Sequence, residues 1–223
     1  IALLRDSIVE ENDDYIALDK PEGIASHGGS GISIGVIETI RNFGKSYRDA
    51  KLVHRLDKDT SGCQVIAKNN KFLRNCNKLI SERKVKKTYQ AIVHGNWIHK
   101  DGIYEINIEK NMLIGKERMV RISDGGKIAK TFFKVIESSK HFSLIQCELI
   151  TGRTHQLRVH LSELGFPIVG DKKYGIKENK LPSSSGHKKR MYLHANSFIS
   201  KDLNIHINVK PPKEFKKILK NDE

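Results

Sequence analysis

The sequence predicts an α+β protein built around a mixed sheet, and two observations indicate this class. Segments with strand-type alternation follow one another without a helix between each pair, and helical periodicity occurs over only a few stretches. Meander order of this kind favours α+β over a strictly alternating α/β fold. With 223 residues, the chain is long enough for one large domain with a sizeable core.

The first third of the chain predicts one strand and two helices. Tyr15–Leu18 has the pattern of a strand, and Lys20–Gly23 that of the turn closing it. Apolar residues at near-helical spacing over 34–40 predict a helix that stops at Gly44. Asn69 or Asn70 can cap a longer helix. The apolar stripe of that helix consists of Phe72, Leu73, Cys76, Leu79 and Ile80. Its basic residues lie mostly off the stripe, on a face that is either solvated or directed toward RNA.

The remaining two thirds alternate between strands and polar connections. Strands are predicted at 86–93, 103–109, 128–135, 142–149, 191–195 and 203–209. The stretch 110–131 is interpreted as a basic region rich in loops, and 177–190 as a polar loop. Thr154 can cap a helix with Leu157, Leu161 and Leu164 toward the core, and Phe215, Ile218 and Leu219 predict a short terminal helix.

Composition narrows the class of partner. Lysine and arginine exceed aspartate and glutamate by 14, with a sequence pI near 9.6, which favours RNA, DNA or an acidic membrane surface. No apolar run of about 18 residues predicts a membrane span, and no signal-peptide pattern opens the chain. Cys63, Cys76 and Cys147 are odd in number and widely spaced, so we expect core residues in a reducing cytosol. The histidines show no metal-ligand spacing, and no metal is predicted.

One polar turn between two apolar runs concentrates reactive residues. Residues 54–62 carry His54, Arg55, Asp57 and Asp59, followed by Thr60, Ser61 and Gly62. A carboxylate among cations can act as nucleophile or base. Asp57 and Asp59 can equally well serve only to bond turn amides, and spacing alone does not decide between the two roles.

The segment from His54 to Asp57, followed by Thr60–Gly62, resembles the active-site motif of the RluA/RluC/RluD family of RNA pseudouridine synthases. The resemblance implies that Asp57 is the catalytic residue. Lys87-Thr-Tyr89 is similar to the second family motif, whose tyrosine packs at the target base. Residues 151–160 resemble the third motif, in which the arginine matching Arg158 pairs with the catalytic aspartate. A half-buried arginine also needs an anionic partner, and Asp57 is the candidate.

The resemblance runs from about Ile8 to Leu219 and is closest to the RluC branch, whose substrate is large-subunit ribosomal RNA. It implies a central, mostly antiparallel sheet with a catalytic cleft across it, and a catalytic domain over 1–223. Members of this branch usually carry an N-terminal S4-like RNA-binding domain, which is absent from this chain. Since position 1 is Ile, we expect the chain to be a piece of a longer protein. We also expect a cytoplasmic location and a monomer.

The implied reaction isomerises uridine to pseudouridine in RNA. The N1 glycosidic bond breaks, the base turns, and the bond forms again at C5, without a cofactor. Asp57 either attacks C1′ or takes the C2′ proton. Tyr89 stacks on the base, and Leu157 and Arg158 support the site. Arg55 enters the space of a flipped-out uridine. The expected RNA-contacting residues are His54, Arg55, Arg153, His155 and Gln156.

Three alternatives remain open at this point. One is a tRNA-directed pseudouridine synthase of the same family. The second is a non-catalytic RNA-binding module for ribosome assembly, which explains the charge but needs no carboxylate beside an arginine. The third is a metal-free ribonuclease that uses His54 with another histidine, and it predicts cleavage of the RNA chain.

Overall fold

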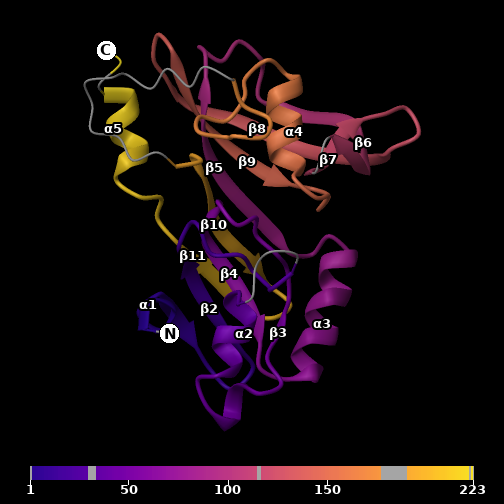
Figure 1. Ribbon diagram of the computed structural model, residues 1–223, viewed down its shortest axis with the longest axis vertical. Helices are drawn as coiled ribbons and strands as arrows, with labels where there is room; N and C mark the ends of the chain where they lie inside the picture. The colour runs from indigo at the N-terminus through magenta and orange to yellow at the C-terminus, as the bar shows by residue number, and fades with distance from the viewer. Residues whose placement is uncertain (1, 30–33, 115–116, 177–189, 221, 223) are drawn as a thin grey trace. The chain divides into compact units, whose positions relative to one another are not determined.

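The computed structural model describes the chain except for residues 1, 30–33, 115–116, 177–189, 221 and 223 (Figure 1). The chain forms two compact units. The first unit comprises Ile1–Lys87 and His194–Pro211, and the second comprises Thr88–Leu193 and Pro212–Glu223. All of the loop predicted at 177–190 except Arg190 lies outside the described residues.

The sheet of the first unit is mixed. Its strands are β1 (Ile8–Glu11), β2 (Tyr15–Lys20), β3 (Lys51–Leu52), β4 (Ser61–Ala67), β10 (Leu193–Ser200) and β11 (Ile205–Asn208). β4 is central: it pairs antiparallel with β2 and β3 and parallel with β10. β1 and β11 extend the sheet by antiparallel pairing with β2 and β10. Every residue of β4 is buried, as expected for a strand covered on both faces.

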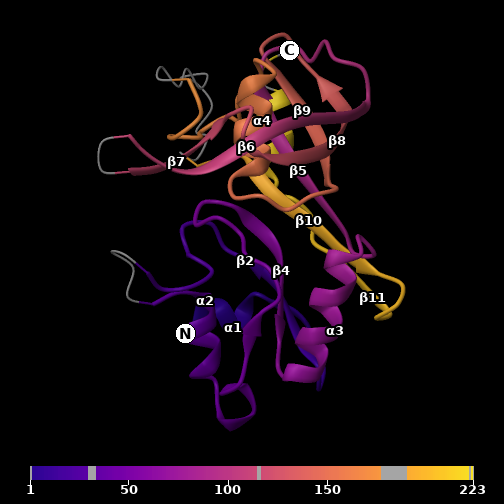
Figure 2. The ribbon, with the colours of Figure 1, turned by 90° about the vertical axis from the view of Figure 1, so that its right-hand side faces the viewer.

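Helices cover both faces of this sheet (Figure 2). Alternate residues of β2 point to opposite sides. Ile16 and Leu18 pack in one cluster with α1 (Ala2–Asp6) and α2 (Val36–Arg41). Tyr15 faces the other way and stacks on Phe72 of α3 (Asn70–Ser81), with 5.2 Å between the ring centroids. A single 3₁₀ turn, Lys45–Tyr47, follows α2.

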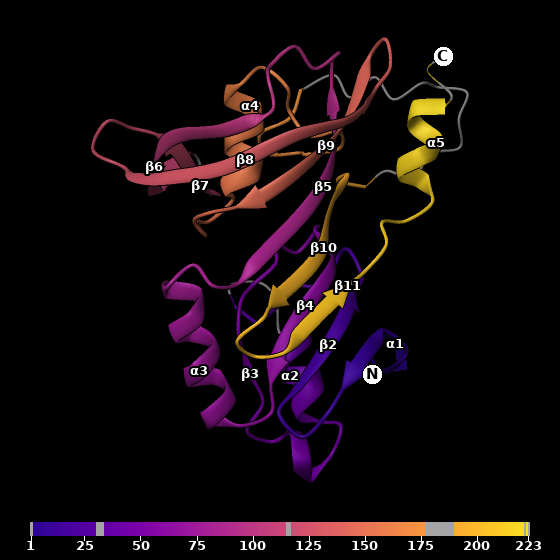
Figure 3. The same cartoon turned by 180° about the vertical axis from the view of Figure 1, so that it is seen from behind.

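The second unit holds an antiparallel sheet. Its strands are β5 (Lys86–His94), β6 (Gly102–Ile114), β7 (Glu117–Ile122), β8 (Lys127–Ser138) and β9 (Phe142–Leu149), in the spatial order β5-β9-β8-β6-β7. α4 (Gln156–Glu163) and α5 (Glu214–Lys220) pack on opposite faces, as Figure 3 shows from behind. His160 of α4 meets Phe133 edge-on, whereas Phe215, Ile218 and Leu219 of α5 join a cluster with Ile92 and Leu144.

The predicted α+β class and the strands over the β2, β5, β8 and β9 regions are confirmed, and so are the helices near α3 and α5. Asn69 caps α3, because its side-chain oxygen accepts a hydrogen bond from the Phe72 amide at 2.9 Å. All three cysteines are buried and free. Burial raises the pKa of the Cys63 thiol to about 12 and that of Cys76 to about 11, so both are protonated core residues. In the part of the chain described, no helix is long and apolar enough to cross a membrane.

Two predictions of local structure are wrong. The basic stretch predicted as loop is largely a hairpin, since β6 runs on to Ile114 and pairs with β7, with Met112 opposite Met119. The side-chain pattern of this stretch gives only a weak strand signal, and the strands form because their backbones pair. Thr154 is not the cap of α4: the helix begins after His155, whose φ of 53° is left-handed. The structure also adds α1 and β1, which the sequence pattern did not indicate.

His160 makes the stability of the fold depend on pH. It is fully buried, and burial lowers its pKa from 6.5 to about 4. Between these values the unfolded chain binds a proton that the folded chain does not. The free energy of unfolding should therefore fall by up to ~1.4 kcal/mol per pH unit on acidification from 6.5 toward 4. Urea unfolding of His160→Leu should show a shallower fall than the wild type. The exposed His206→Leu should match the wild type, and equal slopes in all three proteins would contradict the assignment.

Candidate active site

The predicted catalytic motif forms the loop between β3 and β4, in the first unit. Leu56 is buried and anchors the loop. Asp57 next to it is half-buried, whereas Asp59 is exposed. The Thr60 amide donates to the Asp57 carbonyl at 3.1 Å, which closes a turn immediately before β4. The two carboxylates therefore lie in different surroundings, and Asp57 has the more enclosed position.

Ser26 fixes the backbone next to Asp57. Its buried hydroxyl donates to the Leu56 carbonyl at 2.7 Å and accepts from the Leu56 amide at 3.0 Å. The same oxygen accepts from the Gln64 side-chain amide at 2.9 Å. One hydroxyl thus bonds both polar groups of a single loop residue and ties that residue to β4. A buried network in which the hydroxyl's bonding capacity is used holds one conformation well.

Lys20 holds the loop from its other side. This lysine is fully buried at the end of β2, and its ammonium donates to the carbonyls of Pro21, Ile24 and Lys58 at 2.8, 2.8 and 3.2 Å. The Gly23 amide also donates to the Lys58 carbonyl at 2.8 Å. The turn from Lys20 to Gly23, predicted only to close the first strand, therefore also hydrogen-bonds the backbone of Lys58, the residue after Asp57. Burying a cation is costly unless it is bonded, and three carbonyl oxygens offset that cost.

His54 has a structural position. Its ring stacks on Phe198 of β10, with centroids 5.2 Å apart, and its Nε2 accepts from the Val65 amide at 3.1 Å. Burial, with repulsion from Lys87, lowers the pKa of His54 to about 3, so the ring is neutral. With Nε2 occupied by a backbone donor, the ring ties the loop to β4. This arrangement does not favour a general base, nor the RNA contact suggested by the sequence.

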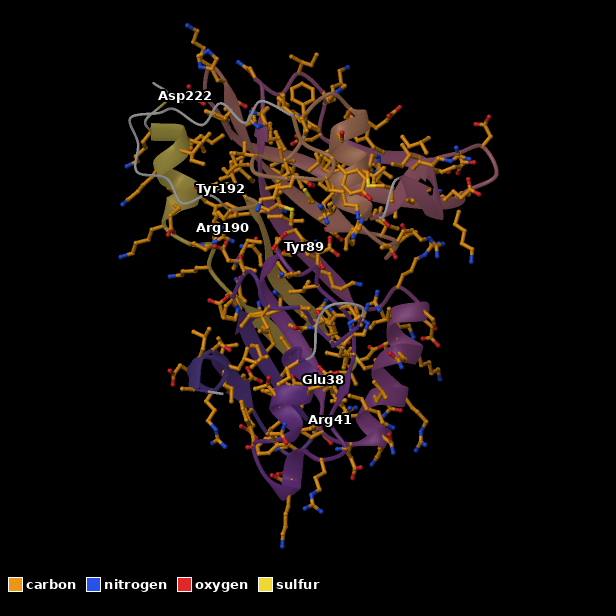
Figure 4. All side chains as sticks on the ribbon, in the orientation of Figure 1. Glu38, Arg41, Tyr89, Arg190, Tyr192 and Asp222 are labelled. Carbon is orange, nitrogen blue, oxygen red and sulfur yellow. The ribbon has the colours of Figure 1, made fainter. Side chains whose placement is uncertain are left out.

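Arg55 is exposed and is held at its tip by His27. The Arg55 guanidinium lies 2.9 Å from His27 Nε2, which must accept because a guanidinium only donates. The carboxylate of Glu38, on α2 (Figure 4), accepts from the amides of Gly28 and Gly35 at 3.0 and 2.9 Å. Burial opposes its ionisation, but these amides keep the pKa of Glu38 below its usual value. The segment carrying His27 is thereby attached to the helix.

Gly62 permits the close approach of β4 to β10. Its φ is +107°, and an added Cβ would lie 2.2 Å from the Ala195 carbonyl oxygen. Beside it, His194 Nε2 donates to the Val209 carbonyl at 3.3 Å, so Nδ1 accepts from the Ser61 hydroxyl at 2.9 Å. The Thr60-Ser-Gly62 part of the motif therefore serves strand pairing directly behind the loop.

The other predicted site residues lie in the second unit. Tyr89 is buried on β5 (Figure 4), with Cys147 opposite it on β9. Leu157 is buried on α4. α4 is buried nearly all round, including Arg158 and His160, so an amphipathic stripe does not fix its orientation. Polar contacts at the N-terminus of α4 fix its orientation instead.

Gln156 makes the largest number of those contacts. Its side-chain oxygen accepts from the Arg153 amide at 3.0 Å and from the Thr151 hydroxyl at 2.9 Å. Its side-chain nitrogen donates to the Lys130 carbonyl at 2.9 Å and to the Thr131 hydroxyl at 3.0 Å. Since all four positions are used inside the unit and the side chain is buried, Gln156 is a structural residue. The RNA contact expected from the sequence is not supported.

Arg153 and His155 are half-buried beside this network. Arg153 Nε donates to the Ile128 carbonyl at 3.1 Å. The Tyr174 hydroxyl accepts from the Val120 amide at 3.0 Å and lies 2.8 Å from His155 Nδ1. Arg153 is thus oriented by β8 and His155 by Tyr174 in the segment after α4, and both side chains remain partly open to solvent.

Arg158 forms a bidentate pair with Asp171. Nε and Nη2 lie 2.7 and 2.8 Å from the two carboxylate oxygens. Burial alone would raise the pKa of Asp171, but Arg158 and the amides of Lys173 and Tyr174 hold the pKa below its ordinary value. The guanidinium also lies 5.1 Å from the centroid of the Tyr174 ring. Arg158 is therefore fixed by the segment after α4, and Asp171 is an anionic partner that the sequence did not reveal.

Known proteins resemble the chain over most of its length. The sequence family described as RNA pseudouridylate synthase matches residues 14–163. The chain belongs to this family. Ribosomal large subunit pseudouridine synthase C is 42% identical over 197 residues in both Salmonella typhi and Escherichia coli K12, covering 87% of this chain and 62% of the relative. The chain thus spans about three fifths of the length of these relatives.

Solved structures agree with this RNA pseudouridylate synthase fold. Human RNA pseudouridylate synthase domain containing 4 aligns with a TM-score of 0.80 and 26% identity, over 98% of this chain and 94% of that one. Human RNA pseudouridylate synthase domain containing 1 aligns with a TM-score of 0.74 and 27% identity, over 94% and 84%. The fold predicted from the motif resemblance is confirmed.

In this member of the family, the predicted site residues of the Asp57 loop and of the start of α4 form two sets, one in each unit. His54, Arg55 and Asp57 share the loop of the first unit, and residues 153–158 share the start of α4 in the second. The pairing of Asp57 with Arg158 stays a prediction. Sequence reasoning missed Lys20, Ser26 and Asp171. One available signal was Lys20 itself, which continues the inward alternation of Ile16 and Leu18 in a strand.

Breaking the Arg158–Asp171 pair should destabilise the protein strongly. Asp171→Asn keeps the shape but leaves a buried guanidinium short of charge compensation, so we expect a loss of ~3–5 kcal/mol in the free energy of unfolding. Glu109→Gln breaks the exposed Arg121–Glu109 pair instead and should cost less than ~1 kcal/mol. Urea unfolding at pH 7 measures both values. Similar losses in the two variants would refute the importance of the buried pair.

Proposed function

We propose that this protein isomerises specific uridines to pseudouridine in RNA, and that its substrate is large-subunit ribosomal RNA. The observation that carries the proposal is the Asp57 loop. In a chain of the pseudouridylate synthase family, a half-buried carboxylate follows a residue whose backbone is bonded on both sides by Ser26. A fixed carboxylate is what attack on a sugar carbon, or removal of a sugar proton, requires.

Asp57 is the proposed catalytic residue, either as nucleophile at C1′ or as base at C2′. In both routes the N1–C1′ bond breaks, the uracil turns, and C5 bonds to C1′; the C5 proton passes to solvent, and N1 takes up a proton in its place. The atoms of the substrate are conserved and no electron donor is consumed. We further propose that Tyr89 stacks on the turning base and that Arg158 supports the carboxylate.

The RNA partner follows from charge and family together. The formal net charge of +14 suits a polyanion, and the bacterial relatives are named for the large ribosomal subunit. We place the enzyme in the cytoplasm, as a monomer acting without metal or cofactor.

Of the alternatives, the His54 ribonuclease is disfavoured because the Nε2 atom of His54 accepts from the Val65 amide.

A pair of matched substitutions tests the reaction. Asp57→Asn keeps size and removes charge and nucleophilicity, so it should fold and bind RNA but release no tritium from uridine labelled at C5. Asp59→Asn, exposed two residues away, should keep substantial activity. Transcripts of large-subunit rRNA and of tRNA serve as substrates. An active Asp57→Asn beside an inactive, folded Asp59→Asn would overturn the assignment. Labelled tRNA as the preferred substrate would overturn the rRNA proposal alone.

Arg55 should matter most for uridines inside stems. Unstacking a base costs a few kcal/mol, and an exposed arginine held at its tip by His27 can help to offset this cost. Arg55→Ala should therefore reduce kcat/KM on a stem substrate about tenfold more than on an unpaired one. Rates on the same uridine in a hairpin and in an unfolded strand give the comparison. Equal losses on both substrates would rule out the flipping role.

A further inference from the structure

Helix α3 carries a surface made only of basic and amide side chains. Lys71, Arg74 and Lys78 are exposed and lie within about 60° of one another around the helix axis. Phe72 and Cys76, which are buried, occupy the opposite side. We call the surface formed by Lys71, Arg74 and Lys78 the cationic face. The sequence left two interpretations open for it, a solvated surface and a surface directed toward RNA.

Few acidic groups neutralise the cationic face. Within the described part of the chain, Lys71 and Arg74 make no ion pair, and Lys78 reaches Glu82 only at 4.0 Å. Other lysines and arginines are matched at shorter distance: Lys68 with Glu11 at 2.9 Å and Lys130 with Glu105 at 2.7 Å. Three neighbouring cations with one distant carboxylate among them repel one another, and this repulsion is relieved when they meet phosphates.

The helix that carries the cationic face follows the candidate catalytic loop along the chain, and both belong to the first unit. β4 leads from the Asp57 loop into α3, and α3 runs back beside β4 within the first unit (Figures 1 and 3). Beyond α3, Lys87 is near enough to interact electrostatically both with Cys76 of α3 and with His54 of the loop. One further cation of the first unit thus lies near both the buried side of α3 and the loop that carries Asp57.

We propose that the cationic face of α3 binds the phosphate backbone of the RNA strand that delivers its uridine to Asp57. This inference rests on the proposed function and adds a specific contact surface to it. The three side chains carry charge but present no rigid base-reading geometry, so they should position RNA without selecting its sequence. A helix provides this spacing of cations without any rearrangement of the fold.

Charge-neutralising variants test the proposal. The first combines Lys71→Gln, Arg74→Gln and Lys78→Gln, all at exposed positions where glutamine suits a helix. The control combines Lys213→Gln, Lys216→Gln and Lys217→Gln at exposed positions in and just before α5. Both remove three positive charges. Circular dichroism and thermal unfolding establish that each is folded before binding is measured.

Fluorescence anisotropy with a single-stranded rRNA fragment, titrated at several salt concentrations, gives the decisive number. Loss of three phosphate contacts should make the slope of log K against log salt shallower by about 2. The affinity of the α3 variant should fall about 100-fold at 0.1 M salt and approach that of the wild type near 1 M. The α5 variant should keep the wild-type slope. Equal slopes in the α3 variant and the wild type, or equal changes in both variants, would overturn the proposal.

Activity separates this inference from the proposed function. At saturating RNA the α3 variant should form pseudouridine with kcat within about twofold of the wild type and with a raised KM. A wild type that binds RNA but forms no pseudouridine would defeat the proposed function. The salt slopes would still test whether the cationic face binds RNA phosphates. A large loss of kcat with unchanged KM would count against a positioning role for α3.

Discussion

The bonds between the Ser26 hydroxyl and the backbone of Leu56 are the constraint on which the candidate site depends. A reactive carboxylate is useful only if its position is fixed, and a loop lacks the regular backbone hydrogen bonds that fix a strand. Here one side-chain oxygen does for Leu56 what a neighbouring strand would do, donating to its carbonyl and accepting from its amide. Lys20 does the same for the carbonyl of Lys58. Asp57 lies between two residues that are both held, so its own backbone has little freedom.

The second unit uses the same principle with different residues. α4 is buried on nearly every side, and a helix of that kind can rotate unless specific bonds oppose it. Gln156 makes four hydrogen bonds, to β8 and to the segment before the helix, and Asp171 pairs with Arg158 from the segment after it. Each of these polar groups would be costly to bury alone. Their mutual satisfaction turns that cost into a preference for one orientation.

The sequence predicted what local pattern encodes and missed what distant partners decide. Asn69 and the apolar stripe of α3 are local signals, and the helix follows them. The start of α4 depends on a left-handed His155 and on bonds from Gln156 to β8, 25 residues away, which no local propensity encodes. Ser26 likewise lies 30 residues from Leu56. Asp57 itself emerged from a motif resemblance, because spacing alone did not distinguish it from Asp59.

The histidines show how residue type alone misleads in a protein of this kind. Ten histidines in a basic chain suggest acid–base chemistry or metal binding. Yet His54 accepts from a backbone amide, His160 lies buried against Phe133, and His194 bridges Ser61 and Val209. With the pKa of His54 at about 3 and that of His160 at about 4, neither ring gains charge near neutral pH. Lysine and arginine therefore dominate the positive potential of the protein near neutral pH. The strength of this potential should respond to ionic strength far more than to the protonation of these histidines.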